Sequence, residues 1–457
     1  MRAHQHQFAS YAPGMSKVVV IGGGIAGLAC AHRLVSASSH LDVSLLEADE
    51  RVGGKVHAVD FAGRRVDLGA DALLARSKDA VRFVEEVGLA SQMVSPAERH
   101  AWVWSRGALR PLPAGAVLGL PSSLQGLASS GLLSDEGLAR AAKGYSHRSH
   151  VDCTVGGALR ARFGDEFVER FSSPLLGGIY AGDIDSYELA TAAPQLEDIA
   201  GRDIPDSFGP PLTDPVFFSF PGGLGQLTEK TAETLAGRIR LGHTVTSVGH
   251  DQRFRVDTTN GAFEADAVVV ALPSRQAVTV LGGQFPSLAA ELSGISYADV
   301  AMIVLSVEEA SMPKLPEGSG FLVPRIEERF ITACSWWSKK WAHGPVSGTT
   351  VLRCSVGGVK DERHKRMSDD QIVDAVLRDL RLMIGLTAAP SAVRVERWPA
   401  AIPQYELGHA ARLERIGEHL RLTPGLFLCG AAYGGVGVAG CIAGARRTAD
   451  ELSKLLP

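Results

Sequence analysis

Cysteine is scarce in this chain, and its spacing argues against two common uses. The 457 residues contain six cysteines, and no two of them form a C-x-x-C pair. Five of them have apolar or small neighbours, which is typical of reduced thiols in a protein core. We therefore expect neither disulfide bonds nor a metal site, and a reducing compartment such as the cytoplasm. The six are Cys30, Cys153, Cys334, Cys354, Cys429 and Cys441.

Long apolar runs and an excess of charge of one sign are also missing. No stretch reaches the roughly 18 consecutive apolar residues that a membrane-spanning helix needs. The formal net charge of −4 and the pI near 6.4 give no reason to expect a nucleic acid partner. Residues 1–14 are polar and lack the apolar core of a signal peptide, so Met15 is a candidate start residue. These features predict a cytoplasmic protein, either soluble or resting on a membrane surface.

Charge is absent altogether from one stretch, Pro111 to Ser134, which is rich in leucine. Its three prolines and several glycines argue against a long helix. Two interpretations stay open. The stretch is either a buried irregular segment or a surface that touches lipid or an apolar substrate.

The chain does have a glycine-rich turn between two apolar patterns near its start. Val18 to Ile21 is an apolar run of the kind found in buried strands, and Gly22 to Gly27 follows with the spacing G-x-G-x-x-G. A helix-like pattern comes next, and a second apolar run ends in Glu47, 20 residues after Gly27. This is the layout of a βαβ dinucleotide-binding unit. The glycines let the backbone approach a pyrophosphate at a helix N-terminus, and Glu47 can accept hydrogen bonds from a ribose.

A second glycine pair follows this acid, in Arg51-Val52-Gly53-Gly54-Lys55. An NAD site does not need a glycine pair so close to the ribose. The pattern E-x-x-x-R-x-G-G resembles an extension found in the FAD-containing amine oxidase superfamily, and an ordinary Gly-Gly turn is the alternative. We therefore expect FAD rather than NAD.

The rest of the chain alternates between nucleotide-domain patterns and other structure. Ala267 to Val270 and Gly425 to Gly430 are further buried runs, so the nucleotide sheet is predicted to be built from distant segments. Residues 79–190 look mainly helical, and residues 296–360 look like antiparallel strands. The predicted fold class is α/β: a discontinuous Rossmann-like FAD-binding domain, an α+β substrate domain and an inserted helical domain. The predicted domains are 15–78, 214–278 and 397–457 for FAD binding, 79–190 for the helical domain, and 191–213 with 279–396 for the substrate domain.

Two further segments have shapes that turn chemistry alone does not explain. Gly177 to Asp183 places glycine pairs around an Ile-Tyr step and predicts a tight loop. Tyr433 to Gly440 is a second glycine-rich turn between a strand and a helix. That helix can aim its N-terminus at a flavin ring, which gains negative charge on reduction.

Together these motifs resemble those of the porphyrinogen oxidases, the protoporphyrinogen oxidase and coproporphyrinogen III oxidase branch of the amine oxidase superfamily. The first turn and the glycine pair after Glu47 are shared by the whole superfamily. The segment 178–183 and the string Pro403-Gln404-Tyr405 with Gly408-His409 point to the porphyrinogen branch. Lys55 and Ala70 depart from the residues common at these positions in relatives.

The resemblance implies a set of binding residues. FAD is expected at Gly22, Gly23, Gly24, Ile25, Ala26, Gly27, Glu47, Ala48, Arg51, Gly54, Lys55, Gly69, Ala70, Asp71, Ala72, Val245, Trp398, Val436, Gly437 and Val438. Gly178 and Ile179 are expected to lie against the substrate macrocycle, and Arg76 and Lys78 are candidate cations for its propionates. No catalytic acid or base and no metal ligand is expected.

The resemblance also implies a reaction: the oxygen-dependent oxidation of coproporphyrinogen III to coproporphyrin III in haem biosynthesis. It removes six electrons in three FAD-mediated steps and releases peroxide, and the protein chiefly orients the substrate. The expected partners are the porphyrinogen, dioxygen and, transiently, the next haem-pathway enzyme, with peripheral membrane contact by the helical domain. Three alternatives stay open: a protoporphyrinogen IX oxidase, an amine oxidase or carotenoid desaturase, and a non-catalytic FAD-binding partner.

Overall fold

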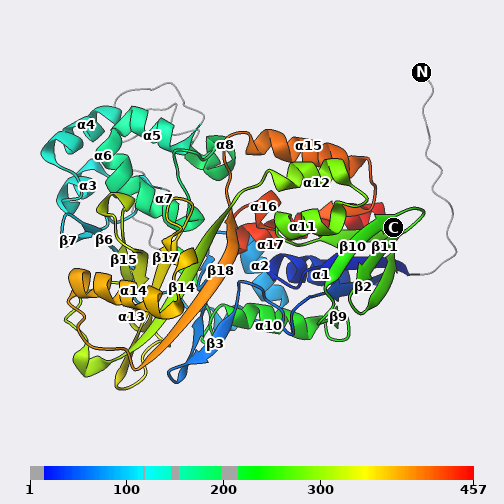
Figure 1. Cartoon of the computed structure of the whole chain (residues 1–457), viewed down its shortest axis with the longest axis horizontal. Coiled ribbons are helices and arrows are strands. Elements are labelled where there is room, and N and C mark those ends of the chain that lie inside the picture. Colours follow the sequence, from blue (N-terminus) through cyan, green and yellow to red (C-terminus); the bar gives the residue numbers. More distant parts are fainter. Residues whose placement is uncertain (1–14, 117–118, 146–153, 197–214, 457) are drawn as a thin grey trace.

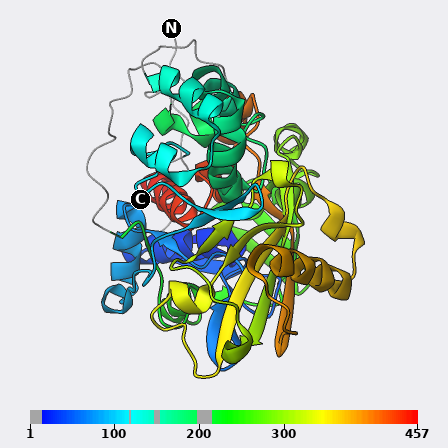
Figure 2. The same ribbon diagram turned by 90° about the vertical axis from the view of Figure 1, so that its left-hand side faces the viewer.

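The computed structural model describes residues 15–116, 119–145, 154–196 and 215–456. Figure 1 shows three regions: a parallel sheet with its helices on the right, a large mixed sheet at the lower left, and a group of helices at the upper left. In the view turned by 90°, this group of helices stands above the two sheets (Figure 2). The fold is a mixed α/β fold, as the sequence predicted.

The parallel sheet is covered on both faces. Its elements are β1 (Ser16–Ile21), β2 (Leu41–Leu46), β9 (Ile239–Arg240), β13 (Ala267–Val270) and β19 (Leu426–Leu428), with β10 (Val245–His250), β11 (Phe254–Thr258), β12 (Gly261–Ala265), α1 (Ile25–Ala37), α2 (Lys78–Glu86), α10 (Gly225–Thr234), α11 (Ser274–Leu281), α12 (Pro286–Ser293), α15 (His409–Arg421), α16 (Ala431–Gly434) and α17 (Val438–Leu455) around it. The strand order is β19-β13-β1-β2-β9, and all neighbours pair in parallel. Val18 and Val20 pack towards α1 and α17, whereas Val19 and Ile21 pack towards β10, β11 and α11. Burial on both faces explains the continuous apolar runs in the sequence.

The large sheet has seven strands in the order β18-β14-β17-β16-β15-β6-β7. Its elements are β6 (Trp102–Ser105), β7 (Ala108–Pro111), β14 (Tyr297–Glu308), β15 (Gly320–Leu322), β16 (Ile331–Ser335), β17 (Thr349–Gly357) and β18 (Ala392–Pro403), with α13 (Trp337–Lys340) and α14 (Asp369–Ile384). The helix α14 begins with a capping box between Ser368 and Gln371 and lies on the outer side of the sheet (Figure 2). Val304 and Val351 point to the other face, where they pack on Val66 of the hairpin β3 (Ala58–Phe61) and β4 (Arg64–Asp67).

Strand pairing places two segments differently from the prediction. Residues 102–111 fall in the stretch predicted as helical, but they form β6 and β7, and β6 pairs in parallel with β15. Trp102 and Trp104 alternate with Val103 there, and such aromatic and β-branched residues favour strands. Residues 397–403, predicted with the FAD-binding segments, continue β18 beside β14.

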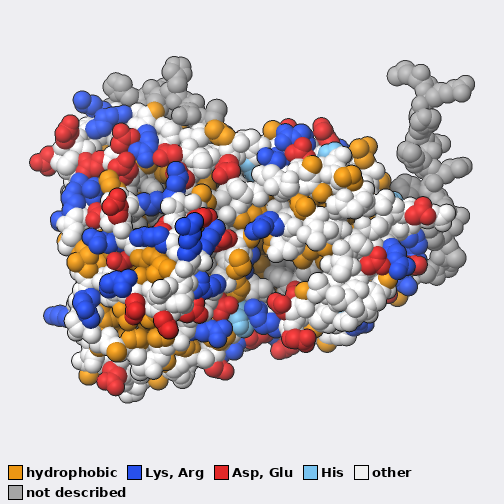
Figure 3. All heavy atoms as spheres, in the orientation of Figure 1, with side chains coloured by type: hydrophobic (Ala, Val, Ile, Leu, Met, Phe, Trp, Pro, Cys, Tyr) orange, Lys and Arg blue, Asp and Glu red, His pale blue; other side chains and the backbone are white. Residues whose placement is uncertain are grey.

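The group of helices, here called the helical part (residues 119–145 and 154–196), has its own apolar core. Its elements are α3 (Leu124–Ser130), α4 (Asp135–Tyr145), α5 (Val155–Phe163), α6 (Asp165–Phe167), a π-helical turn (Val168–Ser172), α7 (Ser173–Tyr180) and α8 (Leu189–Ala192). Leu120, Leu127 and Leu132 of the uncharged stretch are buried in this core. The buried interpretation of that stretch is therefore confirmed for these residues, and residues 117–118 lie outside the described part. Lys, Arg, Asp and Glu side chains are interspersed on the face of the helical part seen in Figure 3.

The loop predicted over residues 177–183 is wrong for its first half. Gly177, Gly178 and Ile179 lie in the last turns of α7, which ends where Ala181 takes a left-handed conformation (φ 48°). Burial of Leu176 and Tyr180 in the helical core offsets the weak helix propensity of the two glycines.

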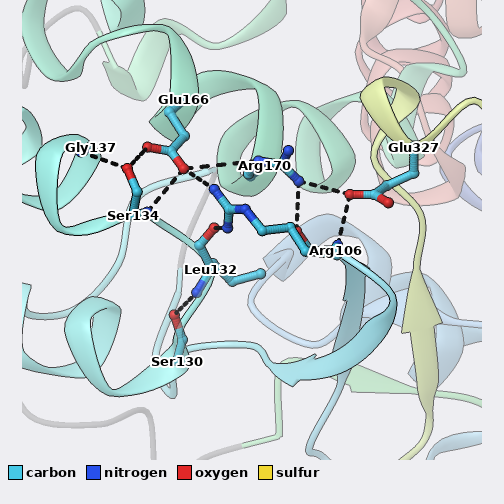
Figure 4. Close-up of polar contacts among 9 residues, drawn as sticks. Arg106, Ser130, Leu132, Ser134, Gly137, Glu166, Arg170 and Glu327 are labelled. Carbon is cyan, nitrogen blue, oxygen red and sulfur yellow. Dashed lines mark hydrogen bonds and ion pairs between the residues drawn. The ribbon is translucent and has the colours of Figure 1, made fainter.

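A network of charged side chains ties the helical part to the large sheet (Figure 4). Arg106, in the β6–β7 turn, pairs with Glu166 of α6 and donates from Nη1 to the carbonyl oxygen of Leu132 at 2.7 Å. Arg170 of the π-helical turn pairs with Glu327, which follows β15, at 2.7 Å. Each arginine therefore bridges elements of two regions, which fixes the helical part against the sheet.

The sequence predicted reduced cysteines, no membrane-spanning helix and no metal site. Cys30, Cys334, Cys354, Cys429 and Cys441 are buried and unpaired, while Cys153 lies outside the described residues. Among the described helices, none is both long enough and apolar enough to cross a membrane. The described residues contain no group of three or more His, Cys, Asp or Glu side chains placed to hold a metal ion.

Candidate functional site

The first glycine turn connects the end of β1 to α1 and leaves one side open. A Cβ atom on Gly27 would lie 1.9 Å from the carbonyl oxygen of Gly22, so a side chain is excluded there. A Cβ on Gly24 would meet nothing within 4 Å. Gly24 is the N-cap of α1, no side chain caps this helix, and its first turn has no acidic residue. The N–H groups of the first turn are therefore available to an anion.

The second glycine pair packs directly on this turn. The N–H of Gly53 donates to the carbonyl oxygen of Gly23 at 2.8 Å, and a Cβ on Gly54 would lie 3.5 Å from the Cα of Gly24. Arg51 donates from Nη1 to the carbonyl oxygen of Gly54 at 3.2 Å. The pair therefore extends the first turn into one continuous backbone surface, which an ordinary isolated turn would not do.

Glu47 lies at the end of β2 and holds the turn from the other side. Its Oε2 accepts from the N–H of Gly23 at 2.6 Å, and its Oε1 accepts from the N–H of Asp49 at 2.9 Å. The carbonyl oxygen of Glu47 accepts from the N–H of His243 at 2.8 Å, which places the start of β10, and hence Val245, next to this acid. Each carboxylate oxygen keeps a further lone pair for a ribose hydroxyl. The neighbouring Ala48 is exposed.

A third segment, residues 67–72, closes the site from the side of the large sheet. A Cβ on Gly69 would lie 2.0 Å from the carbonyl oxygen of Lys55. The backbone of Lys55 therefore requires glycine at position 69. The indole Nε1 of Trp398 donates to the carbonyl oxygen of Leu68 at 2.9 Å. Ala72 packs in the small core between this segment and the large sheet. Lys55, Gly69 and Trp398 are thus brought together, as the resemblance implies.

Asp71 is held by two cations from the large sheet and the helix beside it. Arg353 of β17 lies 2.7 Å from its Oδ2, and Lys340 of α13 lies 2.8 Å from the same oxygen. Arg353 also donates from Nη2 to the carbonyl oxygen of Gly69 at 2.6 Å. Burial alone would raise the pKa of Asp71, but the two cations outweigh it and hold the pKa well below the usual range of a carboxyl group. This cluster fixes the conformation of the third segment, including Ala70.

Lys55 is a half-buried cation near the first turn. Burial lowers the pKa of its ammonium group. Among the described residues, no hydrogen bond or ion pair is made by this group. A charge that is partly removed from water gains from an anionic partner, so Lys55 fits a site for an anionic ligand.

The second glycine-rich turn leads from β19 to α17, which packs side by side with α1 (Figure 1). Gly435 and Gly437 have positive φ angles of 118° and 88°, and Gly437 caps α17 without a side-chain hydrogen bond. Val438 packs in the core of the parallel sheet, whereas Val436 packs against the helical core. The turn therefore lies where the two cores meet.

These segments fit a dinucleotide cofactor. The helices α1 and α17 both begin without side-chain caps, Gly24 leaves open space, and Lys55 offers an unpaired positive charge. The glycine turn and the first turn of α1, with Ile25 and Ala26 anchored in the core, would hold the pyrophosphate. The 435–438 turn would lie at the other end of the cofactor.

The two expected substrate residues lie on the last turns of α7. A Cβ on Gly178 would lie 3.9 Å from Cδ2 of Leu322 in β15, so α7 runs over the large sheet at this point. The side chain of Ile179 is 46% exposed, which is unusual for isoleucine and leaves it free to contact a ligand.

Arg76 and Lys78 lie away from α7 in the described contacts. They follow β5 (Leu73–Leu74), which pairs with β8 (Phe217–Phe218), and they stand at the start of α2. Both are exposed and line a surface hollow with Val81, Arg82 and Glu85. No described contact joins them to Ile179, so their part in substrate binding stays a prediction.

Some residues that stabilise the site are distant from it in sequence and were not predicted. Arg353 and Lys340 are far from Asp71 in sequence and carry no motif of their own. Tyr405 was noted only as part of a family string, yet its hydroxyl contacts the second glycine-rich turn.

The comparisons with known proteins agree with this geometry. The family model of flavin-containing amine oxidoreductases matches residues 25–453. The chain belongs to this family. It is therefore a flavin-dependent oxidoreductase, and its cofactor is FAD, as the nucleotide turns predicted.

Individual relatives of this flavin oxidoreductase cover nearly its whole length. A coproporphyrinogen III oxidase from Bacillus subtilis is 34% identical over 97% of this chain and 99% of its own. A chloroplastic and mitochondrial protoporphyrinogen oxidase from Arabidopsis thaliana is 24% identical over 95% of this chain and 93% of its own. A solved structure from Exiguobacterium sp. 255-15, described as a candidate protoporphyrinogen oxidase, has a TM-score of 0.86 at 32% identity and covers 97% of this chain and 100% of that one. The resemblance to the porphyrinogen oxidases is thus confirmed.

Proposed function

We propose that this protein oxidises coproporphyrinogen III to coproporphyrin III, with dioxygen as the electron acceptor. The observation that carries the proposal is the full-length similarity to coproporphyrinogen III oxidase, which exceeds that to the plant protoporphyrinogen oxidase. The absence of a membrane-spanning helix among the described residues is compatible with either substrate. Protoporphyrinogen IX is the second candidate.

The residues of this chain would act by binding and orientation. When bound, FAD supplies the redox chemistry and accepts two electrons in each of three steps. Gly22 to Gly27 and Lys55 would hold its anionic part. Ile179 would present an apolar surface to one face of the macrocycle, and Gly178 would let the macrocycle approach the helix backbone. Arg76 and Lys78 are proposed to attract the propionates. No described side chain is assigned as a general acid or base: ring N–H protons can leave to solvent, and the remaining meso C–H proton can move to a ring nitrogen by tautomerisation of the macrocycle.

Substrate preference is the direct test. With the FAD-loaded protein, we expect initial rates on coproporphyrinogen III to exceed those on protoporphyrinogen IX, and a polyamine to give no turnover. Under anaerobic conditions the visible flavin absorbance should bleach on mixing with coproporphyrinogen. Rapid bleaching by the polyamine alone would favour an amine oxidase. Flavin that no porphyrinogen bleaches would mean that the protein is a non-catalytic FAD-binding partner.

Replacing Ile179 should affect the substrate more than the fold. In Ile179→Ala we expect kcat/KM to fall by roughly 10- to 30-fold, because an apolar side chain buried against a ligand contributes about 1.5–2 kcal/mol. The melting temperature should change little, since the side chain is already half exposed. Leu382→Ala is the matched control, because Leu382 on α14 is 53% exposed and should leave kcat/KM unchanged. Equal effects of the two substitutions would contradict a substrate contact at Ile179.

We also propose the three-domain arrangement predicted from the sequence, and contacts with a membrane and with another enzyme. A peripheral contact of the helical part with a membrane and a transient contact with the next haem-pathway enzyme follow from the resemblance alone. Sedimentation with anionic vesicles would test the first contact. Transfer of coproporphyrin to that enzyme without release to solvent would test the second.

A further inference from the structure

Two neighbouring residues at the end of the large sheet connect the substrate side of the site to the flavin side. Gln404 and Tyr405 follow directly after β18 and are 2% and 4% exposed. A polar side chain is rarely buried this deeply unless it has specific partners. Both residues have such partners, and these lie in different parts of the fold.

The hydroxyl of Tyr405 holds the second glycine-rich turn at two points. It donates to the carbonyl oxygen of Ala431 and accepts from the N–H of Gly435 at 3.2 Å. The turn has little side-chain packing of its own at Gly435 and Gly437, where φ is positive. On its opposite side it rests on α17, where a Cβ on Gly440 would lie 2.5 Å from the carbonyl oxygen of Gly435. The turn is therefore held in place by α17 on one side and by the Tyr405 hydroxyl on the other.

The ring of Tyr405 is fixed independently of its hydroxyl. It stacks on the imidazole of His409, with ring centroids 4.2 Å apart and planes inclined by 16°. It also packs in the helical core beside Tyr180. Removing only the oxygen atom should therefore leave the ring in place while the turn loses both hydrogen bonds.

Gln404 holds the end of α7. Its Nε2 donates to the carbonyl oxygen of Tyr180 at 2.9 Å, and its Oε1 accepts from the hydroxyl of Tyr187 at 3.0 Å. Tyr180 directly follows Ile179 in the last turn of α7. No bulkier residue than glycine fits at Gly182, because a Cβ there would lie 2.0 Å from Oε1 of Gln404. The amide thus determines where the exposed Ile179 side chain lies.

We infer that Gln404 and Tyr405 are positioning residues that set the spacing between the flavin and the substrate. Tyr405 aligns the 435–438 turn against the flavin, and Gln404 aligns Ile179 against the macrocycle. The two residues are adjacent just after β18, so one short segment anchors both sides of the site. The part that concerns the substrate rests on the proposed function, whereas the part that concerns the flavin rests on the family membership.

Tyr405→Phe tests the flavin side. We expect the Kd for FAD, measured by quenching of FAD fluorescence on titration into the apoprotein, to rise about tenfold, which corresponds to ~1.4 kcal/mol. The flavin reduction potential and visible spectrum should also shift, because the helix N-terminus at the turn is less well aligned. The matched control is Tyr297→Phe, which removes a half-buried hydroxyl that accepts from the N–H of Ser274 at 2.8 Å. The control should lower thermal stability but leave the Kd for FAD and the potential unchanged.

Gln404→Leu tests the substrate side. We expect KM for the porphyrinogen to rise about tenfold while the Kd for FAD stays within twofold of the wild-type value. Gln404→Glu, which keeps the oxygen that accepts from Tyr187 but loses the donor to the carbonyl oxygen of Tyr180, should not recover the KM. A drop in melting temperature for Tyr405→Phe with an unchanged Kd and potential would overturn the inference. Failure of the proposed function would be distinguishable, because the FAD titration needs no substrate and would still show the effect of Tyr405.

Discussion

Gly24→Ala is expected to weaken FAD binding about a hundredfold, or ~2.7 kcal/mol, without unfolding the apoprotein. Gly24 has φ −68° and ψ 174°, a conformation that alanine adopts without strain. In the free protein the added Cβ would meet no atom within 4 Å. With FAD bound, the same methyl group would occupy the space through which the pyrophosphate approaches the backbone. FAD titration and thermal unfolding of the apoprotein measure the two effects separately.

Gly27→Ala is the contrasting variant. Its Cβ would lie 1.9 Å from the carbonyl oxygen of Gly22, so this substitution should destabilise the protein whether FAD is present or not. The two alanines thus separate a glycine that is needed by the cofactor from one that is needed by the fold. Wild-type affinity for FAD in the Gly24 variant would mean that the pyrophosphate lies elsewhere.

Arg353→Met is expected to lower the free energy of unfolding by about 3 kcal/mol, because removal of one partner leaves a buried charge poorly compensated. The side chain of Arg353 is only 4% exposed, and it contacts both Asp71 and the carbonyl oxygen of Gly69. Lys340 would still pair with Asp71 and keeps the loss from being larger. Because the third segment would shift, FAD affinity should fall as well. Urea unfolding at neutral pH measures the first effect.

The pH dependence of this loss follows from the lowered pKa of Asp71. A carboxyl group whose pKa is lower in the folded state stabilises the fold above its unfolded pKa, and this contribution is lost as the pH falls through the folded pKa. The part of the difference between wild type and Arg353→Met that comes from Asp71 should therefore shrink below about pH 5. The difference should also grow as Asp67 ionises near neutral pH, because burial raises the pKa of Asp67 to about 7 and Arg353 stabilises its carboxylate. Arg255→Met, which removes an exposed ion pair with Asp257, should cost less than ~1 kcal/mol. A loss for Arg353→Met that is no greater than this would argue against a structural role for the cluster.

The sequence predicted those parts of the site whose geometry is set by near neighbours in the chain. In Gly22 to Gly27 and in Gly53-Gly54, residue type and spacing together dictate a strand, a turn and a helix start. The buried parallel strands were recognised from their apolar runs, because both of their faces are covered. These signals are local, and the structure confirms them.

The remaining features depend on packing between segments that are distant in sequence. The glycines before Ile179 indicated a loop, but contacts of Leu176 and Tyr180 in the helical core keep α7 helical. Strand β6 lay in a stretch predicted as helical, and its partner β15 lies about 220 residues away in the chain. The role of Arg353 likewise cannot be predicted before β17 is placed beside the third segment, where Arg353 contacts Gly69. No local pattern encodes such pairings.

The parallel sheet takes its strands from both ends of the chain, and this has a consequence for biosynthesis. β1 and β2 leave the ribosome early, but β13 and β19 follow only with residues 267–270 and 426–428. The FAD site, which also needs the 435–438 turn, therefore cannot form until residues 426–438 have been synthesised. Pairing over such sequence distances is slow and leaves apolar strands exposed in the nascent chain. Since FAD stabilises only the finished fold, a shortage of the vitamin from which it is made should reduce the amount of this protein in the cell as well as its activity.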